Sequence, residues 1–138
     1  MGGADVILDT HIIKKIIKEE ELRKNFFTKI KEKCHNLIIA PLESEYRTRI
    51  EPGLNFKTAF KTELRGKFIQ ERPPVRRIKC GLKKGDKKLA GTAIKRAEKS
   101  GNAIIITEDP DFWRNRECFK FLKKHGVDVM SINEFLSE

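Results

Sequence analysis

Residues 5–13 read "DVILDTHII", and this stretch decides the predicted fold. The apolar residues Val6, Ile7 and Leu8 are followed directly by Asp9. A short apolar run without alternation is typical of a strand buried on both faces, as in parallel sheets. Asp9 would then stand at the carboxyl end of this strand, where its carboxylate either caps the following helix or belongs to a site.

The same order of strand and helix recurs along the chain. Further buried strands are predicted at residues 36–40, 102–107 and 127–130. From apolar spacing, proline and glycine positions and a capping box at Ser131 and Glu134, helices are predicted over residues 11–19, 20–34, 41–50, 55–70, 86–100 and 112–125, and after Ser131. Strands that alternate with helices indicate an α/β fold, whose parallel sheet is covered by helices on both faces.

Length and composition place limits on the class of protein. A chain of 138 residues suits one domain, here residues 1–138, and buries enough surface to fold without disulfides or metal. The three cysteines show no metal-ligand or disulfide spacing, which favours a reducing compartment. The sequence shows no signal peptide and no apolar run near the ~20 residues that span a bilayer. We therefore expect a cytoplasmic protein without a membrane partner.

Positive charge is concentrated in the middle of the chain. The net charge is +10, and residues 52–88 hold twelve Lys or Arg against three acidic residues. A basic block of this kind suits a polyanion, most often nucleic acid, although a solvated lysine-rich surface is the alternative. This basic segment covers about residues 52–85. The residues in it that we expect to contact the nucleic acid are Arg72, Arg76, Arg77, Lys79, Lys83 and Lys84.

Acidic residues fall where strands end or where the following helices begin. These residues are Asp9, Glu43, Glu45, Asp86, Asp109 and Asp111. Each alone could be a helix cap or a surface residue. Gathered at one edge of a parallel sheet they would repel one another, and a divalent cation would offset that repulsion. Oxygen ligands of this kind select Mg²⁺ or Mn²⁺, which activate water and stabilise charge on a phosphoryl group.

Three stretches carry a family resemblance. "VILDTHII", "DKKLAGTAI" and "IIITEDPDF", in this order and at these separations, resemble the PIN-domain nucleases, a family that includes the VapC toxins. The closing "HGVDVMSINEFL" is similar to the family's last strand and helix. The likeness covers about residues 5–49 and 85–138. It implies a three-layer α/β/α sandwich with a central four- to five-stranded parallel sheet.

The resemblance also implies roles for individual residues. By position, Asp9 matches the family's first acid, Asp86 the third and Asp109 the fourth. Glu45 matches the second acid, with Glu43 as the alternative. These four, Asp9, Glu45, Asp86 and Asp109, would be the catalytic residues and the ligands of Mg²⁺ or Mn²⁺. The supporting residues would be Thr10, Thr107 and Asp111, together with Glu43.

The activity that the resemblance implies is a divalent-metal-dependent endoribonuclease acting on single-stranded or structured RNA. Toxin members of the family pair with an antitoxin protein and form homodimers, so both are candidate partners. The basic middle segment departs from the family pattern and leaves the toxin assignment open. The alternative function is a PIN-fold module that binds RNA or protein without cleaving it.

Overall fold

The computed structural model describes residues 3–39, 64, 68–70, 78 and 81–138. Within them the strands are β1 (Asp5–Leu8), β2 (Asn36–Ile39), β3 (Phe68–Gln70), β4 (Ala103–Ile106) and β5 (Val127–Met130). The helices are α1 (Thr10–Lys18), α2 (Glu20–Glu32), α5 (Lys84–Ser100), α6 (Asp111–Arg114), α7 (Arg116–Lys124) and α8 (Ile132–Ser137). The predicted helix at 41–50 and most of the one at 55–70 lie outside the described residues.

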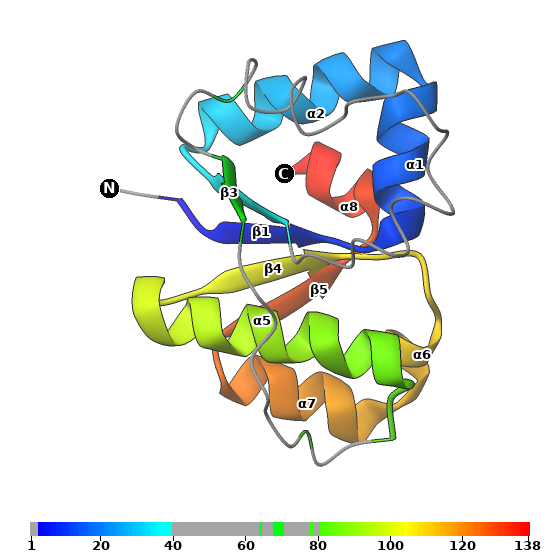
Figure 1. The fold of residues 1–138 in the computed structure, drawn as a ribbon, viewed down its shortest axis with the longest axis vertical. Coiled ribbons are helices and arrows are strands. Elements are labelled where there is room, and N and C mark those ends of the chain that lie inside the picture. Colours follow the sequence, from blue (N-terminus) through cyan, green and yellow to red (C-terminus); the bar gives the residue numbers. More distant parts are fainter. Residues whose placement is uncertain (1–2, 40–63, 65–67, 71–77, 79–80) are drawn as a thin grey trace.

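The five strands form one sheet in the order β3-β2-β1-β4-β5. All four neighbouring pairs are parallel, and the central pair aligns Leu8 of β1 with Ile106 of β4. Helices α1, α2 and α8 cover one face of the sheet, and α5, α6 and α7 cover the other (Figure 1). The predicted three-layer α/β/α sandwich with a parallel sheet is therefore confirmed.

Two hydrophobic cores lie on opposite faces of this sheet. Along β1, Val6 and Leu8 belong to the core under α1, α2 and α8, whereas Ile7 belongs to the core under α5 and α7. Ile104 and Ile106 of β4 follow the first pattern and Ile105 follows the second. Because the central strands are buried on both faces, they read as continuous apolar runs.

Two predicted helices differ from the structure. Residues 68–70 form β3, paired with β2, although the apolar spacing that reaches Phe68 predicts a helix to Gln70. Gly66, which disfavours a helix interior, was the opposing signal in the sequence. The single helix predicted at 112–125 is two helices. Asn115 separates them because its side chain accepts a hydrogen bond from the Cys118 amide and so caps α7.

Local predictions at other chain reversals are confirmed. Ser131 and Glu134 form both hydrogen bonds of the capping box that begins α8. Gly101 ends α5 with a φ of +104°, a conformation that suits glycine.

The prediction of no disulfide is wrong for Cys118, which is disulfide-bonded, whereas Cys34 is free and exposed. Spacing along the chain does not reveal which side chains a fold brings together.

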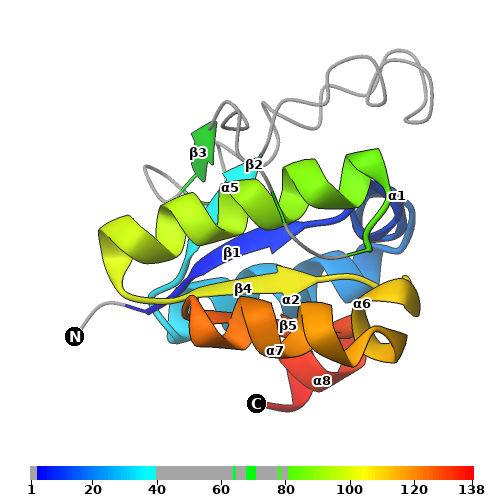
Figure 2. The ribbon, with the colours of Figure 1, turned by 90° about the horizontal axis from the view of Figure 1, so that it is seen from below.

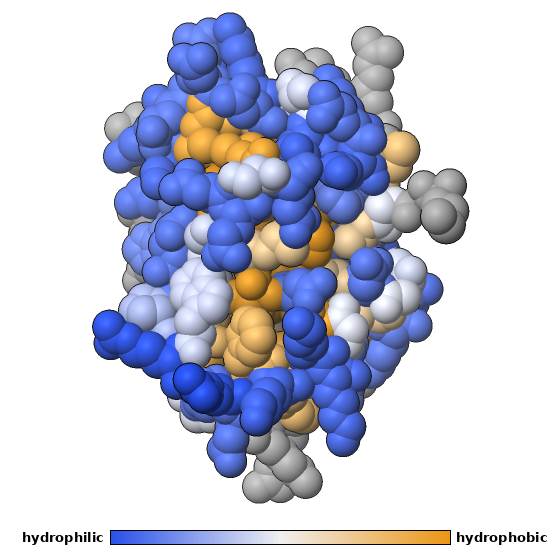
Figure 3. Space-filling view, turned by 180° about the vertical axis from the view of Figure 1, so that it is seen from behind, coloured by the Kyte–Doolittle hydropathy of each residue, from blue (hydrophilic) through white to orange (hydrophobic). Residues whose placement is uncertain are grey.

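One face of the molecule is mainly hydrophilic among the described residues (Figure 3). Figure 3 shows one face on which polar side chains predominate and apolar side chains gather in its upper part and across its middle. Among the described residues, no helix is long and apolar enough to cross a membrane.

A buried ion pair joins the amino end of β1 to α5. Asp5 is fully buried, and its carboxylate accepts hydrogen bonds from Arg96 Nε at 2.9 Å and from Asn36 Nδ2 at 3.1 Å. Because these donors come from α5 and β2, the carboxylate holds three elements together. It lies at the opposite end of β1 from Asp9 and serves the fold.

We expect Asp5→Ala to lower the free energy of unfolding by about 3 kcal/mol, because removing one partner leaves buried donors without their acceptor. Chemical denaturation measures this difference. Asp128→Ala, which changes an exposed aspartate of β5, is the matched control and should stay within about 0.5 kcal/mol of wild type. Equal unfolding midpoints for the two variants would contradict the role given to Asp5.

Candidate metal centre

Asp9 occupies the N-cap position of α1 without using its side chain as a cap. Its backbone is extended, with φ −66° and ψ 152°, and its carbonyl accepts the amides of Ile12 and Ile13. Its carboxylate makes no capping hydrogen bond to α1. It accepts instead from the Thr107 hydroxyl, with 2.7 Å between Thr107 Oγ1 and Asp9 Oδ2. The side chain of Asp9 therefore faces the loop after β4.

Hydrogen bonds in that loop organise the acids that follow β4. The Asp109 amide donates to Thr107 Oγ1 at 3.1 Å, and the Asp111 amide donates to Asp109 Oδ1 at 2.9 Å. The second contact is a turn in which an aspartate accepts the amide two residues ahead. Thr107 is fully buried, so it joins Asp9 to this loop through one fixed hydroxyl.

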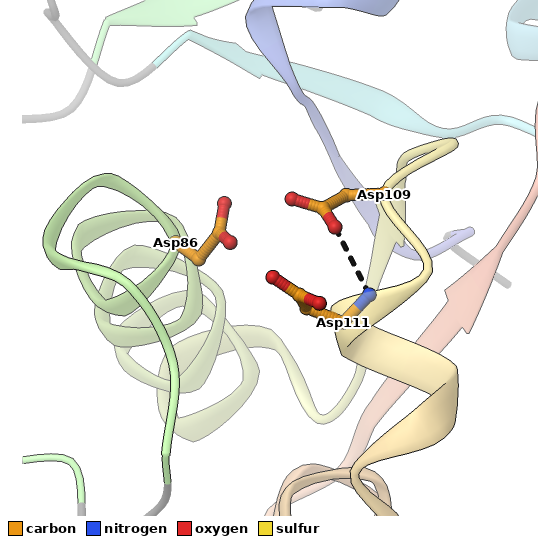
Figure 4. Close-up of side chains that lie close together, drawn as sticks. All are labelled: Asp86, Asp109 and Asp111. Carbon is orange, nitrogen blue, oxygen red and sulfur yellow. Dashed lines mark hydrogen bonds between the residues drawn. The ribbon is translucent and has the colours of Figure 1, made fainter.

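Three carboxylates meet at the carboxyl edge of the sheet. Asp86, in the first turn of α5, faces Asp109 and Asp111 (Figure 4). One carboxylate oxygen from each of the three lies within 4.8 Å of the others. We call these residues the acidic cluster. Figure 2 shows that α6 and the start of α5 lie at the same end of the sheet, which is where the strands finish.

The position of Asp86 is electrostatically unfavourable for an ionised carboxylate. Desolvation raises its pKa from 3.8 to about 7, and the charges of Asp109, Asp9 and Asp111 and a hydrogen bond with Asp109 contribute to the rise. That hydrogen bond requires a proton on one of the two carboxyl groups. Asp86 Oδ2 is buried and has no hydrogen-bond partner among the described residues. Asp9 is connected to the cluster through Thr107, whose hydroxyl contacts both the Asp9 carboxylate and the Asp109 amide.

The acidic cluster can hold a metal ion. Its ligand atoms are carboxylate oxygens, the kind that hard divalent cations prefer. The buried oxygen of Asp86 lacks a donor, and a cation would satisfy it. A cation would also neutralise the repulsion that raises the pKa of Asp86. These observations fit a metal better than they fit a set of helix caps.

The sequence-predicted site residues fall into three groups. Asp86 and Asp109 come together in the acidic cluster, and Asp9 is joined to the loop of Asp109 through Thr107. Asp111, predicted only as a supporting residue, contributes a carboxylate to the cluster itself. Glu43 and Glu45 lie outside the described residues, so the second acid stays a prediction.

The other predicted residues have mixed outcomes. Thr107, predicted as a supporting residue, donates to the Asp9 carboxylate and accepts the Asp109 amide. Thr10 begins α1 and is 3% exposed. Lys83 is exposed beside Asp111, at 3.5 Å from its carboxylate. Lys84 is the first residue of α5. The remaining basic residues, Arg72, Arg76, Arg77 and Lys79, lie outside the described part of the chain.

Comparison with known proteins adds no relative. No family model matches the chain, and no curated protein or solved structure is significantly similar to it. The resemblance to PIN-domain nucleases therefore remains a prediction from the quoted motifs.

The raised pKa of Asp86 predicts how the metal-free protein responds to pH. Between about pH 4 and pH 7 the folded state retains a proton that the unfolded state has lost, so stability falls as pH rises. Asp86→Asn removes this titration. In EDTA at pH 8 we expect a melting temperature about 3–6 °C above wild type, since screening by solvent limits the gain to roughly 1 kcal/mol.

The gain should shrink at pH 5, where wild-type Asp86 is protonated and neutral in the folded state. Differential scanning calorimetry at both pH values measures it. Asp128→Asn, at an exposed position, serves as the control and should show no such dependence on pH. A destabilised Asp86→Asn variant at pH 8 would show that the carboxylate stabilises the metal-free protein.

Proposed function

We propose that the protein is a divalent-metal-dependent endoribonuclease that hydrolyses phosphodiester bonds of RNA. The observation that carries this proposal is the acidic cluster, in which Asp86, Asp109 and Asp111 bring carboxylate oxygens within 4.8 Å of one another. The resemblance of the motifs around Asp9, Asp86 and Asp109 to PIN-domain nucleases supports the same function. The net charge of +10 suits a polyanionic substrate.

The metal would be Mg²⁺ or Mn²⁺, held by the acidic cluster with Asp9 beside it. When bound, such a cation lowers the pKa of water and stabilises negative charge that develops on a phosphoryl group. Glu45 is proposed to complete the set of acids. Hydrolysis then consumes one water for each phosphodiester bond broken and leaves a phosphate on one fragment and a hydroxyl on the other.

The chain's own residues would hold this arrangement in place. Thr107 donates to Asp9 and accepts the Asp109 amide, so it keeps the two acids in one relative position. Asp109 in turn holds the amide of Asp111. Residues fixed by such contacts are preorganised, which is how positioning contributes to catalysis.

We also propose that the enzyme acts in the cytoplasm. The absence of a membrane-spanning helix among the described residues agrees with this location. The spacing of the cysteines favoured a reducing compartment. Because Cys118 is disulfide-bonded, this spacing no longer supports a cytoplasmic location. An antitoxin and a second copy of the chain stay candidate partners.

Asp109→Asn tests the proposed function. The substitution keeps the size of the side chain and removes the negative charge, so we expect Mn²⁺-dependent cleavage of a fluorescent single-stranded RNA to fall at least about 100-fold. Asp128→Asn removes the same charge from an exposed position of β5 and should retain wild-type cleavage. EDTA should abolish cleavage by wild type.

Two results would contradict the proposal. If Asp109→Asn cleaves RNA as fast as wild type, in preparations purified identically, the acidic cluster is not the catalytic site. If wild type binds RNA equally in EDTA and in Mn²⁺ but cleaves none of the RNAs offered, the protein is a binding module.

A further inference from the structure

An open depression of about 660 Å³ lies against the acidic cluster. Its charged lining consists of Lys83, Arg114 and Arg116, opposed by Asp111 and Glu117. Asp111 belongs to both places: its carboxylate is part of the acidic cluster, and the residue lines the depression. The depression and the candidate metal centre therefore adjoin at Asp111.

The two arginines of the depression are available to a ligand. Arg114 ends α6 and Arg116 begins α7, and both are exposed. Neither guanidinium forms an ion pair with another residue in the part of the chain that the structure describes. Arginine presents several N–H donors in a planar fork that matches the oxygens of a phosphate group.

Lys83, which also lines the depression, is held only by a weak ion pair. Its ammonium lies 3.5 Å from Asp111 Oδ2, and the side chains of the pair are 78% and 42% exposed. An exposed ion pair of this kind contributes at most about 1 kcal/mol. A metal ion bound to Asp111 would weaken the attraction further, so Lys83 can exchange its carboxylate partner for a phosphate.

We propose that this depression binds the backbone phosphates that follow the scissile one, through Lys83, Arg114 and Arg116. The proposal rests on the proposed function, because it assumes that a nucleic acid strand has its scissile phosphate at the acidic cluster. A strand leaving the cluster past Asp111 would place its next phosphates over these three cations. Glu117 faces the same space and opposes the bound anion.

Paired charge-removing variants test the subsite. The probe is a fluorescent 12-nucleotide single-stranded RNA, and its Kd is measured in EDTA at several salt concentrations, so that no cleavage occurs. Arg114→Gln/Arg116→Gln removes two charges from the depression. Lys120→Gln/Lys124→Gln removes two exposed charges from α7 outside it and is the matched control.

We call Arg114→Gln/Arg116→Gln the depression variant, and we expect it to raise Kd at least about fivefold at low salt. The slope of log Kd against log salt concentration should fall by about 1.4, which corresponds to two lost phosphate contacts. The control should change Kd less than about twofold. Glu117→Gln should change binding in the opposite direction and lower Kd, because it removes a negative charge from the depression. A DNA strand of the same sequence should show the same ratios, since the contacts are to phosphate.

Equal Kd values for the depression variant and the control would overturn the subsite, as would a raised Kd for Glu117→Gln or undetectable binding of RNA by wild type. Calorimetric titration with Mn²⁺ alone checks that the depression variant still binds metal like wild type. Loss of Mn²⁺ binding would overturn the proposal, since the arginines would then act on the cluster.

The subsite and the nuclease activity can fail separately. If wild type cleaves no RNA but the pattern of Kd values holds, the proposed function fails and the phosphate subsite stands. If Mn²⁺-dependent cleavage holds and the two double variants bind alike, the subsite fails and the nuclease stands.

Discussion

The parallel pairing of β1 with β4 is the constraint on which the site depends. It aligns Leu8 with Ile106, and the amide of Asp9 donates to the carbonyl of Ile106 at 3.1 Å. The next residues of the two strands, Asp9 and Thr107, are therefore neighbours, and the hydroxyl of Thr107 reaches the Asp9 carboxylate. Because both strands are buried on both faces, a change of register would disturb both cores at once.

The arrangement of the acids at this edge lowers the stability of the metal-free protein. Desolvation, together with the charges of three neighbouring carboxylates and a hydrogen bond with Asp109, raises the pKa of Asp86 from 3.8 to about 7, and one of its oxygens lacks a donor. A helix cap does not account for Asp9, because its carboxylate makes no capping contact with α1, the helix that follows it. Strained electrostatics of this kind is typical of functional sites. Cations lie directly beside the cluster, at Lys83, Arg114 and Arg116.

Much of this arrangement follows from the sequence, and the exceptions have physical causes. Apolar runs predict β1, β2 and β4 because strands buried on both faces have little polar sequence. β5 is predicted from the short run "VDVM", although its Asp128 is exposed. β3 is missed because the four-residue spacing of aromatic side chains before it continues through Phe68, despite Gly66. Asp9, Asp86 and Asp109 are found because strand ends and helix starts can be located. The sequence does not show that Asp111 belongs to the cluster, because this depends on how the turn at Asp109 orients the Asp111 side chain. The depression is also invisible in the sequence, since Lys83 lies far along the chain from Arg114 and Arg116.

The most direct test of the account is a crystal of the protein soaked in Mn²⁺ and measured at a wavelength where manganese scatters anomalously. The account predicts an anomalous peak among the carboxylates of Asp86, Asp109 and Asp111, with oxygen atoms at the short distances of direct coordination. Clear density for these three side chains without a peak between them, at millimolar Mn²⁺, would contradict the claim that the acidic cluster is a metal centre.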